Sequence, residues 1–566
     1  MKFKLLGDSN NNVIDNILNR QGVTRKQIDT PRNIITRGYH NMEEAVRLII
    51  DKIHLGKKIA ILADEDADGY CSATILYRYF KDMDYDVDII THYGKVHGVT
   101  TSVVEYIKEN EIDLLLVPDA GSNDELLGCL NCEVVVIDHH QIEKEVPLNT
   151  IRVNNQDELN VNSNKNLTGV GMCYRVLQEL DQALGLRNAD NNLDVVAIGQ
   201  IADSSDISDE EIRYIVNRGI ENIHNKLFLA MLRDRFERKE TITPRDLSFE
   251  VIPYINAVCR VGTKEERKHL LEAMCGMGEY WDVYTIKRRR KDKSNGKFKL
   301  VDIHLTQCDR YFSTELCEIK KRQNEIVTET LKTIVENVYG DGGIVVAIGS
   351  KEIDKSITGL IASKITALYN RPAILLLNNE NQELYTGSIR GKETVVDSLK
   401  HWCEDTGLFN WVLGHDNASG CSIDKDNIEE LVEKTKTIIP KDYLEVDYLC
   451  TKLSPDMIDY FYENRRYYGG RVDYPKIGIE NLPISKLNVS MRGANTLVIE
   501  QGGIDYIIFN VSQEDKALLT NGFSPVVHVD IYGEPSINYF RGKKNRQVIV
   551  NKIALTEKEI DMDFDF

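Results

Sequence analysis

Short apolar runs that stop abruptly at acidic residues dominate the first part of the chain. The clearest runs are residues 61–63, 114–117, 134–137 and 195–201, and the acids that follow them are Asp64, Asp119, Asp138 and Asp203. Short runs of this kind are typical of strands in a parallel sheet that is buried on both faces. The pattern therefore predicts strands whose carboxyl ends meet at one edge of a sheet, where such folds bind ligands.

Segments with helical periodicity separate these runs. Residues 42–53 predict an amphipathic helix, and residues 70–80 and 172–184 predict further helices, the last opened by glycines at 169 and 171. Strands that alternate with helices indicate a doubly wound α/β domain. The amino end of the helix at 70–80 would face the acidic edge, where its backbone amides favour a phosphate or a metal-bound anion.

The second half of the chain predicts another α/β pattern and then a β-rich end. Residues 343–348 and 372–377 predict strands, residues 357–369 a helix, and residues 311–339 a long helix that precedes them. Later runs with strand character have a spacing that suggests a small β-barrel. These runs are residues 496–500, 506–511, 525–532 and 547–553.

The predicted fold class is α/β, with two α/β lobes joined by a long helix and followed by a small β-barrel. The expected segments are a lead segment (1–45), a first α/β domain (46–245), a connecting segment with a basic loop and the long helix (246–340), a second α/β domain (341–440), a β-rich domain (441–556) and an acidic tail (557–566).

Composition places the chain among ordinary soluble globular proteins. Its 566 residues suffice for three to four domains, and 42% hydrophobic and 28% charged residues are unremarkable values. Because no apolar stretch approaches ~18 residues and the N-terminal apolar segment is too short for a signal peptide, a cytoplasmic protein without membrane contact is expected. The eleven cysteines are scattered, and the lone Cys129–Cys132 pair is interpreted as structural.

The net charge of −19 argues against a surface coated with cations. An enzyme that holds one nucleic-acid strand in a channel needs only local positive patches. The largest such patch is the run at 287–293 together with Lys297 and Lys299, which is either a solvated loop or a contact for a DNA backbone. Residues 461–468 and 539–546 mix aromatic and cationic residues, as a single-strand stacking surface or a plain basic hairpin would.

The acids at the predicted sheet edge have the chemistry of a metal site. Asp64, Asp66 and Asp68 are spaced two apart before a glycine, and His139 and His140 follow Asp138 directly. Carboxylate and imidazole ligands together suit Mg²⁺ or Mn²⁺. So many acids converging on one crevice would repel each other unless cations neutralised them. The sequence therefore predicts a divalent metal site.

Four motifs carry a resemblance to a known superfamily. Residues 64–69 (DEDADG), 119–121 (DAG), 138–140 (DHH) and Asp203 resemble the ordered motifs of the DHH phosphoesterases. Within that superfamily the chain resembles the RecJ family of single-strand-specific 5′→3′ DNA exonucleases, from about residue 19 to 552. The resemblance implies a DHH lobe and a DHHA1 lobe joined by a long helix, with an OB-fold behind them, and a role in DNA recombination and repair.

The resemblance also implies two Mn²⁺ or Mg²⁺ ions and their ligands. Asp64 and Asp68 would hold one ion, and Asp66, His139 and Asp203 the other, with Asp119 as a bridge. Many relatives have a histidine four residues before the first aspartate, whereas this chain has Ala60, and Asp68 is the candidate to replace it.

Catalytic and substrate-binding roles are carried over in the same way. Asp138 would orient His139 or His140, and His140 and His415 would contact the scissile phosphate or assist the leaving oxygen. Asn256 and Arg260 match the family's substrate segment, although Tyr254 and Cys259 depart from it.

The loops at 387–391 and 414–420 resemble a phosphate cradle of the second lobe, through Ser388, Arg390 and Gly414. Leu413 replaces a glycine of that motif, and an arginine of the family is missing. His92 or Lys95 would have to replace this arginine, which leaves a requirement for a 5′-phosphate open.

Other hypotheses remain alongside a monomeric exonuclease on single-stranded DNA. The chain is alternatively a DHH phosphodiesterase of short oligonucleotides or cyclic dinucleotides, or an inactive scaffold of a replication complex. The acidic tail at 559–566 ends in phenylalanine. It is either a disordered end or is similar to the tips of single-strand-binding proteins, which implies contacts with repair or replication proteins.

Overall fold

The computed structural model describes most of the chain. Outside the described residues lie 8–11, 93–96, 239, 292–297, 336–337, 340–341, 379–382, 393–394, 439–442, 470–471, 473, 494, 510, 521–524, 541–542 and 557–566. The predicted acidic tail is therefore not described. In the part that is described, no helix is long and apolar enough to cross a membrane.

The described residues form two compact units. The first unit comprises residues 29–333 and 352–361, and the second comprises residues 1–28, 334–351 and 362–566. Each unit has its own sheets and is described by itself below.

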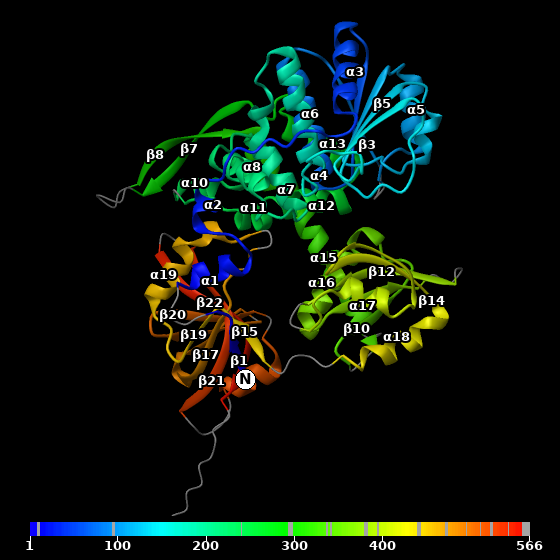
Figure 1. Ribbon diagram of the computed structural model, residues 1–566. Coiled ribbons are helices and arrows are strands. Elements are labelled where there is room, and N and C mark those ends of the chain that lie inside the picture. The colour runs from blue at the N-terminus through cyan, green and yellow to red at the C-terminus, as the bar shows by residue number, and fades with distance from the viewer. Residues whose placement is uncertain are drawn as a thin grey trace, which may run out of the picture. The chain divides into compact units, whose positions relative to one another are not determined.

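A five-stranded sheet is the centre of the first unit (Figure 1). All neighbouring strands are parallel, in the order β3-β2-β4-β5-β6. The strands are β2 (Ile59–Ala63), β3 (Asp88–Thr91), β4 (Leu114–Pro118), β5 (Glu133–Asp138) and β6 (Thr150–Asn154). The predicted strands at 61–63, 114–117 and 134–137 are thus confirmed, and each acid stands where the apolar run predicts it.

Helices cover both faces of this sheet, as a doubly wound fold requires. One face packs against α3 (Met42–His54), α4 (Ala67–Asp82) and α6 (Gly169–Leu184) through a large apolar cluster. The other face packs against α5 (Thr101–Glu109) and the short 3₁₀ turn Glu125–Cys129. The helices predicted at 42–53, 70–80 and 172–184 are confirmed.

The run at 195–201 is not a strand, and this prediction was wrong. It lies inside helix α7 (Leu193–Ala202), in which residues 194–201 are all buried. A helix that is buried on every side shows no polar face, so its sequence cannot be told from that of a buried strand by periodicity. Asp203 nevertheless follows the run directly, at the carboxyl end of the helix.

The rest of the first unit is helical, apart from one hairpin. The helices are α8 (Glu210–Glu221), α9 (Lys226–Met231), α10 (Arg233–Glu237), α11 (Pro244–Glu250), α12 (Ile252–Val261), α13 (Lys264–Cys275), α14 (Gln307–Tyr311) and α15 (Cys317–Val335). A π-helical turn at Phe312–Leu316 connects the last two. The predicted long helix is confirmed to Val335, but Val338–Tyr339 forms a strand instead.

The segment predicted as a basic loop is instead a hairpin. Strand β7 (Val283–Lys291) pairs antiparallel with β8 (Phe298–Thr306). Every second residue of a strand lies on the same face. One face of the hairpin therefore carries the apolar side chains of Tyr284, Ile286, Val301, Ile303 and Leu305. The basic run obscured this alternation in the sequence.

The second unit contains a mixed sheet and a β-rich region. The mixed sheet has the order β13-β14-β12-β11-β10-β9 and confirms the second α/β pattern. Its strands are β9 (Val338–Tyr339), β10 (Val345–Gly349), β11 (Ala373–Leu377), β12 (Leu384–Arg390), β13 (Phe409–His415) and β14 (Ala418–Asp424). Helices α17 (Leu399–Asp405) and α18 (Ile428–Thr435) pack on one of its faces, and α16 is Thr358–Tyr369.

The β-rich region is one seven-stranded sheet in the order β16-β17-β21-β22-β20-β19-β18. Its strands are β16 (Tyr448–Cys450), β17 (Ile477–Ser485), β18 (Val489–Arg492), β19 (Thr496–Gln501), β20 (Ile504–Phe509), β21 (Val526–Phe540) and β22 (Lys543–Leu555). Helices α1 (Val13–Arg20), α2 (Arg25–Asp29), α19 (Pro455–Glu463) and α20 (Gln513–Thr520) accompany it, and β1 (Phe3–Leu5) pairs with β15 (Leu444–Val446).

Close contact between α7 and α8 gives a stability test. A Cβ atom on Gly219 would lie 2.2 Å from the carbonyl oxygen of Leu193 and 2.6 Å from the Cβ of Ala197. We expect Gly219→Ala to cost about 1–3 kcal/mol, because an overpacked helix contact forces the backbone apart. Thermal unfolding followed by circular dichroism would show a lower midpoint. Gly128→Ala is the control, since its Cβ would meet Pro147 at an ordinary 3.5 Å; equal midpoints for both variants would contradict the expectation.

Candidate metal centre

The first carboxylates of the site stand where β2 ends and α4 begins. Asp64 follows the strand directly, and Asp66 is the N-cap of α4, where its side chain accepts a hydrogen bond of 2.9 Å from the Gly69 amide. Asp68 lies in the first turn of the helix. Asp64 and Asp68 are each only 2% exposed. Strand end and helix start therefore aim several carboxylates into a space of a few ångströms.

Asp119 occupies the next strand end along the sheet. It has a left-handed backbone (φ 62°), a conformation that aspartate tolerates better than most residues. Its amide donates a hydrogen bond of 2.8 Å to the carbonyl of Ile137 in the neighbouring strand. Gly169 permits the close approach of α6, because a Cβ atom there would lie 2.3 Å from Asp119 Oδ1.

The amino end of α6 holds Asp68. The carboxylate accepts hydrogen bonds from Thr168 Oγ1 (3.1 Å), the Gly169 amide (2.8 Å) and the Val170 amide (3.2 Å). Amides at a helix start have no partner inside the helix, and they favour a negative charge. The amino end of α6, which contains Gly169, therefore lies in direct contact with Asp68.

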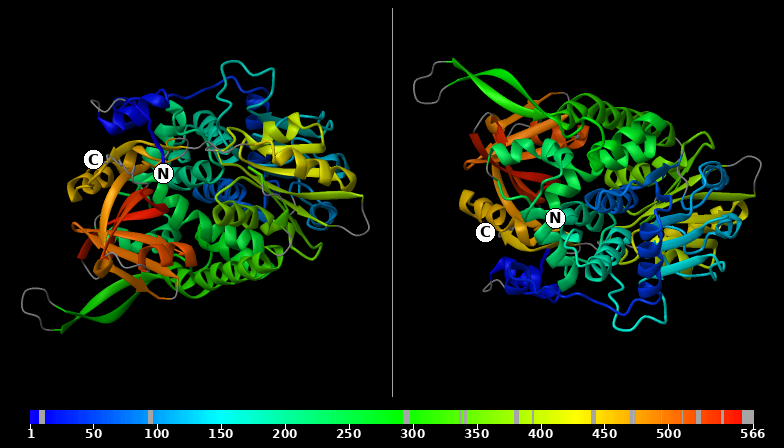
Figure 2. Two further views of the ribbon diagram at one scale, coloured as in Figure 1. Left: turned by 90° about the horizontal axis from the view of Figure 1, so that it is seen from below. Right: turned by 90° about the horizontal axis from the view of Figure 1, so that it is seen from above.

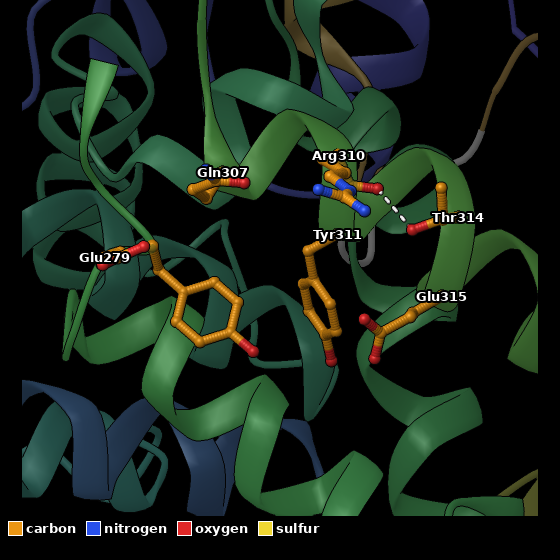
Figure 3. A pocket seen from close by; sticks show the side chains of 7 residues that line it. Glu279, Gln307, Arg310, Tyr311, Thr314 and Glu315 are labelled. Atoms are coloured by element: carbon orange, nitrogen blue, oxygen red, sulfur yellow. Dashed lines mark hydrogen bonds between the residues drawn. The ribbon is translucent and has the colours of Figure 1, made fainter. Parts of the chain in front are cut away.

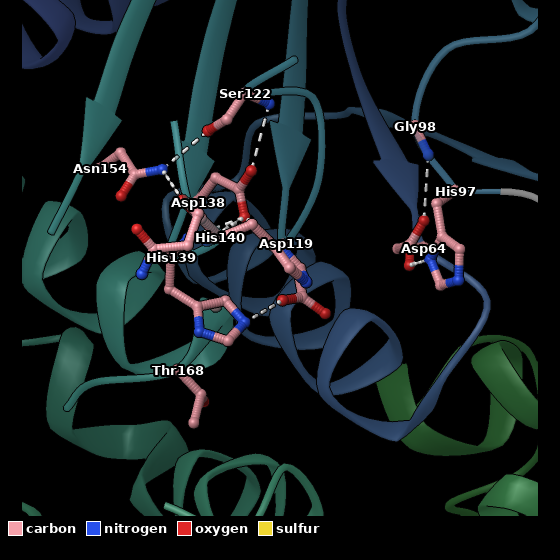
Figure 4. A network of polar contacts seen from close by, with 12 residues as sticks. Asp64, His97, Gly98, Asp119, Ser122, Asp138, His139, His140, Asn154 and Thr168 are labelled. Atoms are coloured by element: carbon pink, nitrogen blue, oxygen red, sulfur yellow. Dashed lines mark hydrogen bonds and ion pairs between the residues drawn. The ribbon is translucent and has the colours of Figure 1, made fainter. Parts of the chain in front are cut away.

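His139 and Asp203 complete the site from β5 and α7. His139 Nε2 lies 3.2 Å from Asp119 Oδ1 (Figure 4). The same nitrogen lies 3.7 Å from Asp203 Oδ2. Three sets of potential ligand atoms each lie within 4.8 Å of one another. These sets are Asp64, Asp66 and Asp119; Asp68, His139 and Asp203; and Asp119, Asp138, His139 and His140. All six residues predicted as metal ligands are brought together, although Asp68 lies with His139 and not with Asp64.

Burial and mutual repulsion oppose ionisation of these acids. Burial, and then Asp203 and Asp66, raise the pKa of Asp68 to about 8. Burial, and then Asp68, Asp66, Asp64 and Asp203, raise the pKa of Asp119 well above its usual value. Asp119 Oδ1 has no hydrogen-bond partner among the described residues. The site thus offers buried carboxylate oxygens and one imidazole, and the carboxylates have few positive charges near them. Such a set of donors fits Mg²⁺ or Mn²⁺.

Asp138 holds the backbone of His139 and the ring of His140. Its Oδ1 accepts hydrogen bonds from the His139 amide (2.7 Å) and from His140 Nδ1 (2.7 Å). Its Oδ2 accepts one from the Ser122 amide (3.1 Å). Although burial opposes these effects, the contact with Asp138 raises the pKa of His140 to about 9, and the same contact lowers the pKa of Asp138. The contact with Asp138 therefore favours the protonated form of His140.

Two contacts of the acids with distant segments were not predicted from the sequence. His97 Nδ1 lies 2.6 Å from Asp64 Oδ2, and the Gly98 amide donates a hydrogen bond of 3.1 Å to Asp64 Oδ1 (Figure 4). Glu65 forms a buried ion pair with Arg267 of α13, which explains why this acid is not part of a ligand set. Neither contact follows a local pattern, because each joins segments that are distant along the chain.

Helix α12 carries the predicted substrate residues of this unit. Asn256 and Arg260 are four residues apart and therefore lie on one face of the helix. Burial lowers the pKa of Arg260, and Asp66 acts in the opposite direction, so the guanidinium lies within electrostatic reach of the acidic cluster. His92, proposed as a replacement for a missing arginine, is only 4% exposed, and Lys95 lies outside the described residues.

The predicted phosphate cradle belongs to the second unit. Ser388 and Arg390 alternate along β12, so they lie on the same face of the sheet, next to Gly420 and Ala418 of β14. Gly414 has φ 127°, and a Cβ atom there would lie 2.8 Å from the carbonyl oxygen of Ala418. The side chain of His415 lies outside the described part of the structure.

The mixed aromatic and basic segments of the second unit are largely self-paired. Lys544 and Arg546 both form ion pairs with Asp459, at 2.9 and 2.7 Å. The Arg465 guanidinium stacks on the Tyr462 ring, 4.0 Å from its centroid. A cation that is already paired binds a phosphate less strongly. For residues 539–546 these contacts therefore favour a plain basic hairpin over a stacking surface for single strands.

Comparisons with known proteins agree with this geometry. Residues 58–200 match the DHH family, N-terminal domain. The chain is 31% identical to YorK, an SPbeta prophage-derived protein of Bacillus subtilis that carries the name of a single-strand DNA-specific exonuclease, over 98% of both chains. It is 24% identical to the single-stranded-DNA-specific exonuclease RecJ of the same organism, over 92% of this chain and 64% of the relative.

Solved structures show the same fold. The crystal structure of RecJ from Thermus thermophilus in complex with Mn²⁺ superposes with a TM-score of 0.67 at 19% identity, over 96% of this chain and 76% of that chain. The corresponding complex with Mg²⁺ gives a TM-score of 0.63 at 18% identity, over 96% and 75%.

Repulsion within the acidic cluster predicts a trade-off between stability and metal binding. Folding raises the pKa of Asp119, so above its unfolded pKa this group destabilises the folded protein. At pH 8 in EDTA we expect Asp119→Asn to melt at least about 2 °C higher than wild type. With Mn²⁺ the wild type should gain stability and the variant should not.

Scanning calorimetry in EDTA and in Mn²⁺ measures both effects. Asp86→Asn is the control, because this side chain is 100% exposed, and it should change neither melting temperature. A variant that melts below the wild type in EDTA would show that the cluster is not under electrostatic strain.

Proposed function

The chain belongs to the RecJ-like family of DHH proteins, and we propose that it is a metal-dependent exonuclease that removes mononucleotides from the 5′ end of single-stranded DNA. Membership makes it a hydrolase of the DHH/RecJ type. The observation that supports the finer proposal best is the convergence of Asp64, Asp66, Asp119, His139 and Asp203 at one sheet edge. We further propose that it acts in DNA recombination and repair, where free single-stranded ends arise.

The ligand sets support a site for two ions. We propose that Asp64, Asp66 and Asp119 hold one ion and that Asp68, His139 and Asp203 hold the other. This assignment exchanges the places of Asp66 and Asp68 relative to the sequence expectation. Two bound Mn²⁺ or Mg²⁺ ions would lower the pKa of a water molecule and neutralise charge on the phosphate oxygens.

His140 is the proposed proton donor. Its ring is about half exposed, and Asp138 holds it through Nδ1, which leaves Nε2 for the substrate. As a cation it would bind a phosphate oxygen and give a proton to the leaving oxygen. Asp138 acts as a positioning residue, since it fixes both the orientation and the charge of His140.

Substrate contacts are proposed in both units. Asn256 and Arg260 would bind the nucleic-acid backbone beside the acidic crevice. Ser388, Arg390 and the turn at Gly414 would bind a phosphate of the strand, where the planar guanidinium can make two parallel hydrogen bonds. His415 remains a candidate for a further phosphate contact.

Labelled substrates test the reaction. With Mn²⁺ we expect single strands to release mononucleotides from the 5′ end, while EDTA, duplex DNA or a blocked 5′ end gives no product. Asp138→Ala and Asp203→Ala should each reduce the rate by about 10³-fold or more, because ligand geometry or the charge of His140 is lost. Asp86→Ala should match the wild type. Release from the 3′ end, or turnover of dinucleotides alone, would contradict the proposal.

The cradle predicts a specific defect in binding. Loss of a charge-assisted, paired hydrogen bond costs about 1.5–3 kcal/mol. Arg390→Gln should therefore raise KM for a 5′-phosphorylated strand at least about tenfold, with a smaller effect on a 5′-hydroxyl strand and on kcat. Lys436→Gln is the control, because it follows α18, which packs on the face of the sheet opposite Ser388 and Arg390. Equal KM values for wild type and Arg390→Gln would remove the cradle from the proposal.

A further inference from the structure

The β7–β8 hairpin has no role in the site described above. Among the described strands, β7 and β8 pair with each other alone, as a separate two-stranded sheet. In Figure 1 and in both views of Figure 2 the ribbon extends outward from the helices of its unit. An isolated two-stranded hairpin is marginally stable in water, so its persistence as regular strands needs an anchor.

The root of the hairpin supplies that anchor. The rings of Tyr280 and Tyr311 meet edge to face with centroids 5.5 Å apart, and the Cys308 amide donates a hydrogen bond of 3.0 Å to the Tyr280 carbonyl. Trp281 Nε1 donates to the Ala273 carbonyl at 2.9 Å. Thr306 caps α14 through a reciprocal pair of hydrogen bonds with Asp309. These contacts therefore hold the start of β7 and the end of β8 against the helices of the unit.

A pocket at this root is a poor site for an anion. It has a volume of about 390 Å³ and is lined by the two tyrosines, Arg310 and the carboxylates of Glu279 and Glu315 (Figure 3). Two carboxylates repel a phosphate, and only one guanidinium lies among them. The strands beyond the root, in contrast, carry mainly cationic and apolar side chains.

The strand register places cations and apolar side chains together on one face. Arg289 lies directly opposite Leu300, and side chains two residues apart share a face, so Lys287 and Phe298 belong to the same side. Phe298 is 67% exposed and Leu300 is 65% exposed. Among the described side chains of this face, Asp302 is the only acid. We call Lys287, Arg289, Phe298 and Leu300 the hairpin face.

We propose that the hairpin face binds single-stranded nucleic acid as a contact separate from the acidic crevice. The structure shows no ion pair for Lys287 or Arg289 among the described residues, in a chain with a net charge of −19. Asp302 lies directly opposite Lys287, whereas Arg289 lies opposite an apolar residue. Cations attract phosphates, and exposed apolar side chains between them offer surfaces for unstacked bases. A duplex would satisfy only the cations, because its bases are stacked inside. This inference rests on the proposed substrate class.

Anisotropy measurements with a labelled 30-mer of thymidine in EDTA test the proposal without turnover. Lys287→Gln with Arg289→Gln should weaken binding about tenfold and reduce the slope of log K against log salt by about 1.4, since two phosphate contacts are lost. Phe298→Ser with Leu300→Ser should weaken binding about fivefold or more and leave the salt slope unchanged. All four side chains are exposed, so the variants should fold.

The control variant removes three cations of the same unit that lie on the side away from the acidic edge of the sheet. Lys81, Lys108 and Arg187 lie at or just beyond the carboxyl ends of α4, α5 and α6, away from the acidic edge. Changing these three to glutamine should leave the affinity within about twofold of wild type. Equal losses of affinity in the control and the hairpin variants would overturn the proposal, and so would unchanged affinity in both hairpin variants. The proposal would also fail if Phe298→Ser with Leu300→Ser weakened binding of a duplex as much as binding of the single strand.

A cleavage assay separates this inference from the proposed function. If the wild type cleaves single strands with Mn²⁺ while the hairpin variants bind and cleave as it does, only the hairpin proposal fails. If the wild type cleaves nothing but the hairpin variants lose affinity in EDTA, the exonuclease proposal fails and the hairpin contact stands.

Discussion

Repulsion between carboxylates at the carboxyl edge of the parallel sheet is the constraint that the first unit must satisfy. Asp64, Asp68 and Asp119 are each 2% exposed, and burial next to other acids raises the pKa values of Asp68 and Asp119. The fold places donors against this charge. The α6 amides donate to Asp68 and the Gly98 amide donates to Asp64, whereas Asp119 Oδ1 has no hydrogen-bond partner among the described residues. These donors compensate only part of the charge, and divalent cations would neutralise the remainder.

The same packing that builds the core also sets the distances in the site. Helices α6 and α7 approach the acids closely because glycines face them. A Cβ atom on Gly199 would lie 2.6 Å from Asp68 Oδ1, and one on Gly169 would lie 2.3 Å from Asp119 Oδ1. A methyl group at Gly199 would push α7 outward and move Asp203 away from the other acids. A methyl group at Gly169 would push α6 outward and move its amides away from Asp68. Core and site therefore cannot vary independently in this unit, and substitutions at these glycines would affect both.

The parts of the site that lie at strand ends could be predicted from the sequence, because an acid that directly follows a buried strand of a parallel sheet lies at the carboxyl edge, where ligands bind. The α7 run could not be assigned, since complete burial removes the periodicity that distinguishes a helix from a strand. The β7–β8 hairpin was hidden because cations on both faces mask the alternation of Ile286, Val301 and Ile303. His97 and the Glu65–Arg267 pair depend on segments that only the tertiary fold brings together.

Charge distribution links the crevice to the rest of the molecule. The proposed substrate is a polyanion, and it would have to approach a chain with a net charge of −19 and a crevice of clustered acids. Bound divalent ions would reverse the sign of the crevice itself, but the Debye length of about 8 Å at physiological salt confines that effect to its surroundings. Attraction over a longer stretch of strand must therefore come from cations placed outside the crevice. Lys287 and Arg289 of the hairpin are such cations, because neither belongs to the acidic ligand sets. If both proposals hold, this acidic protein holds its nucleic acid by separating the charges that catalysis needs from those that binding needs.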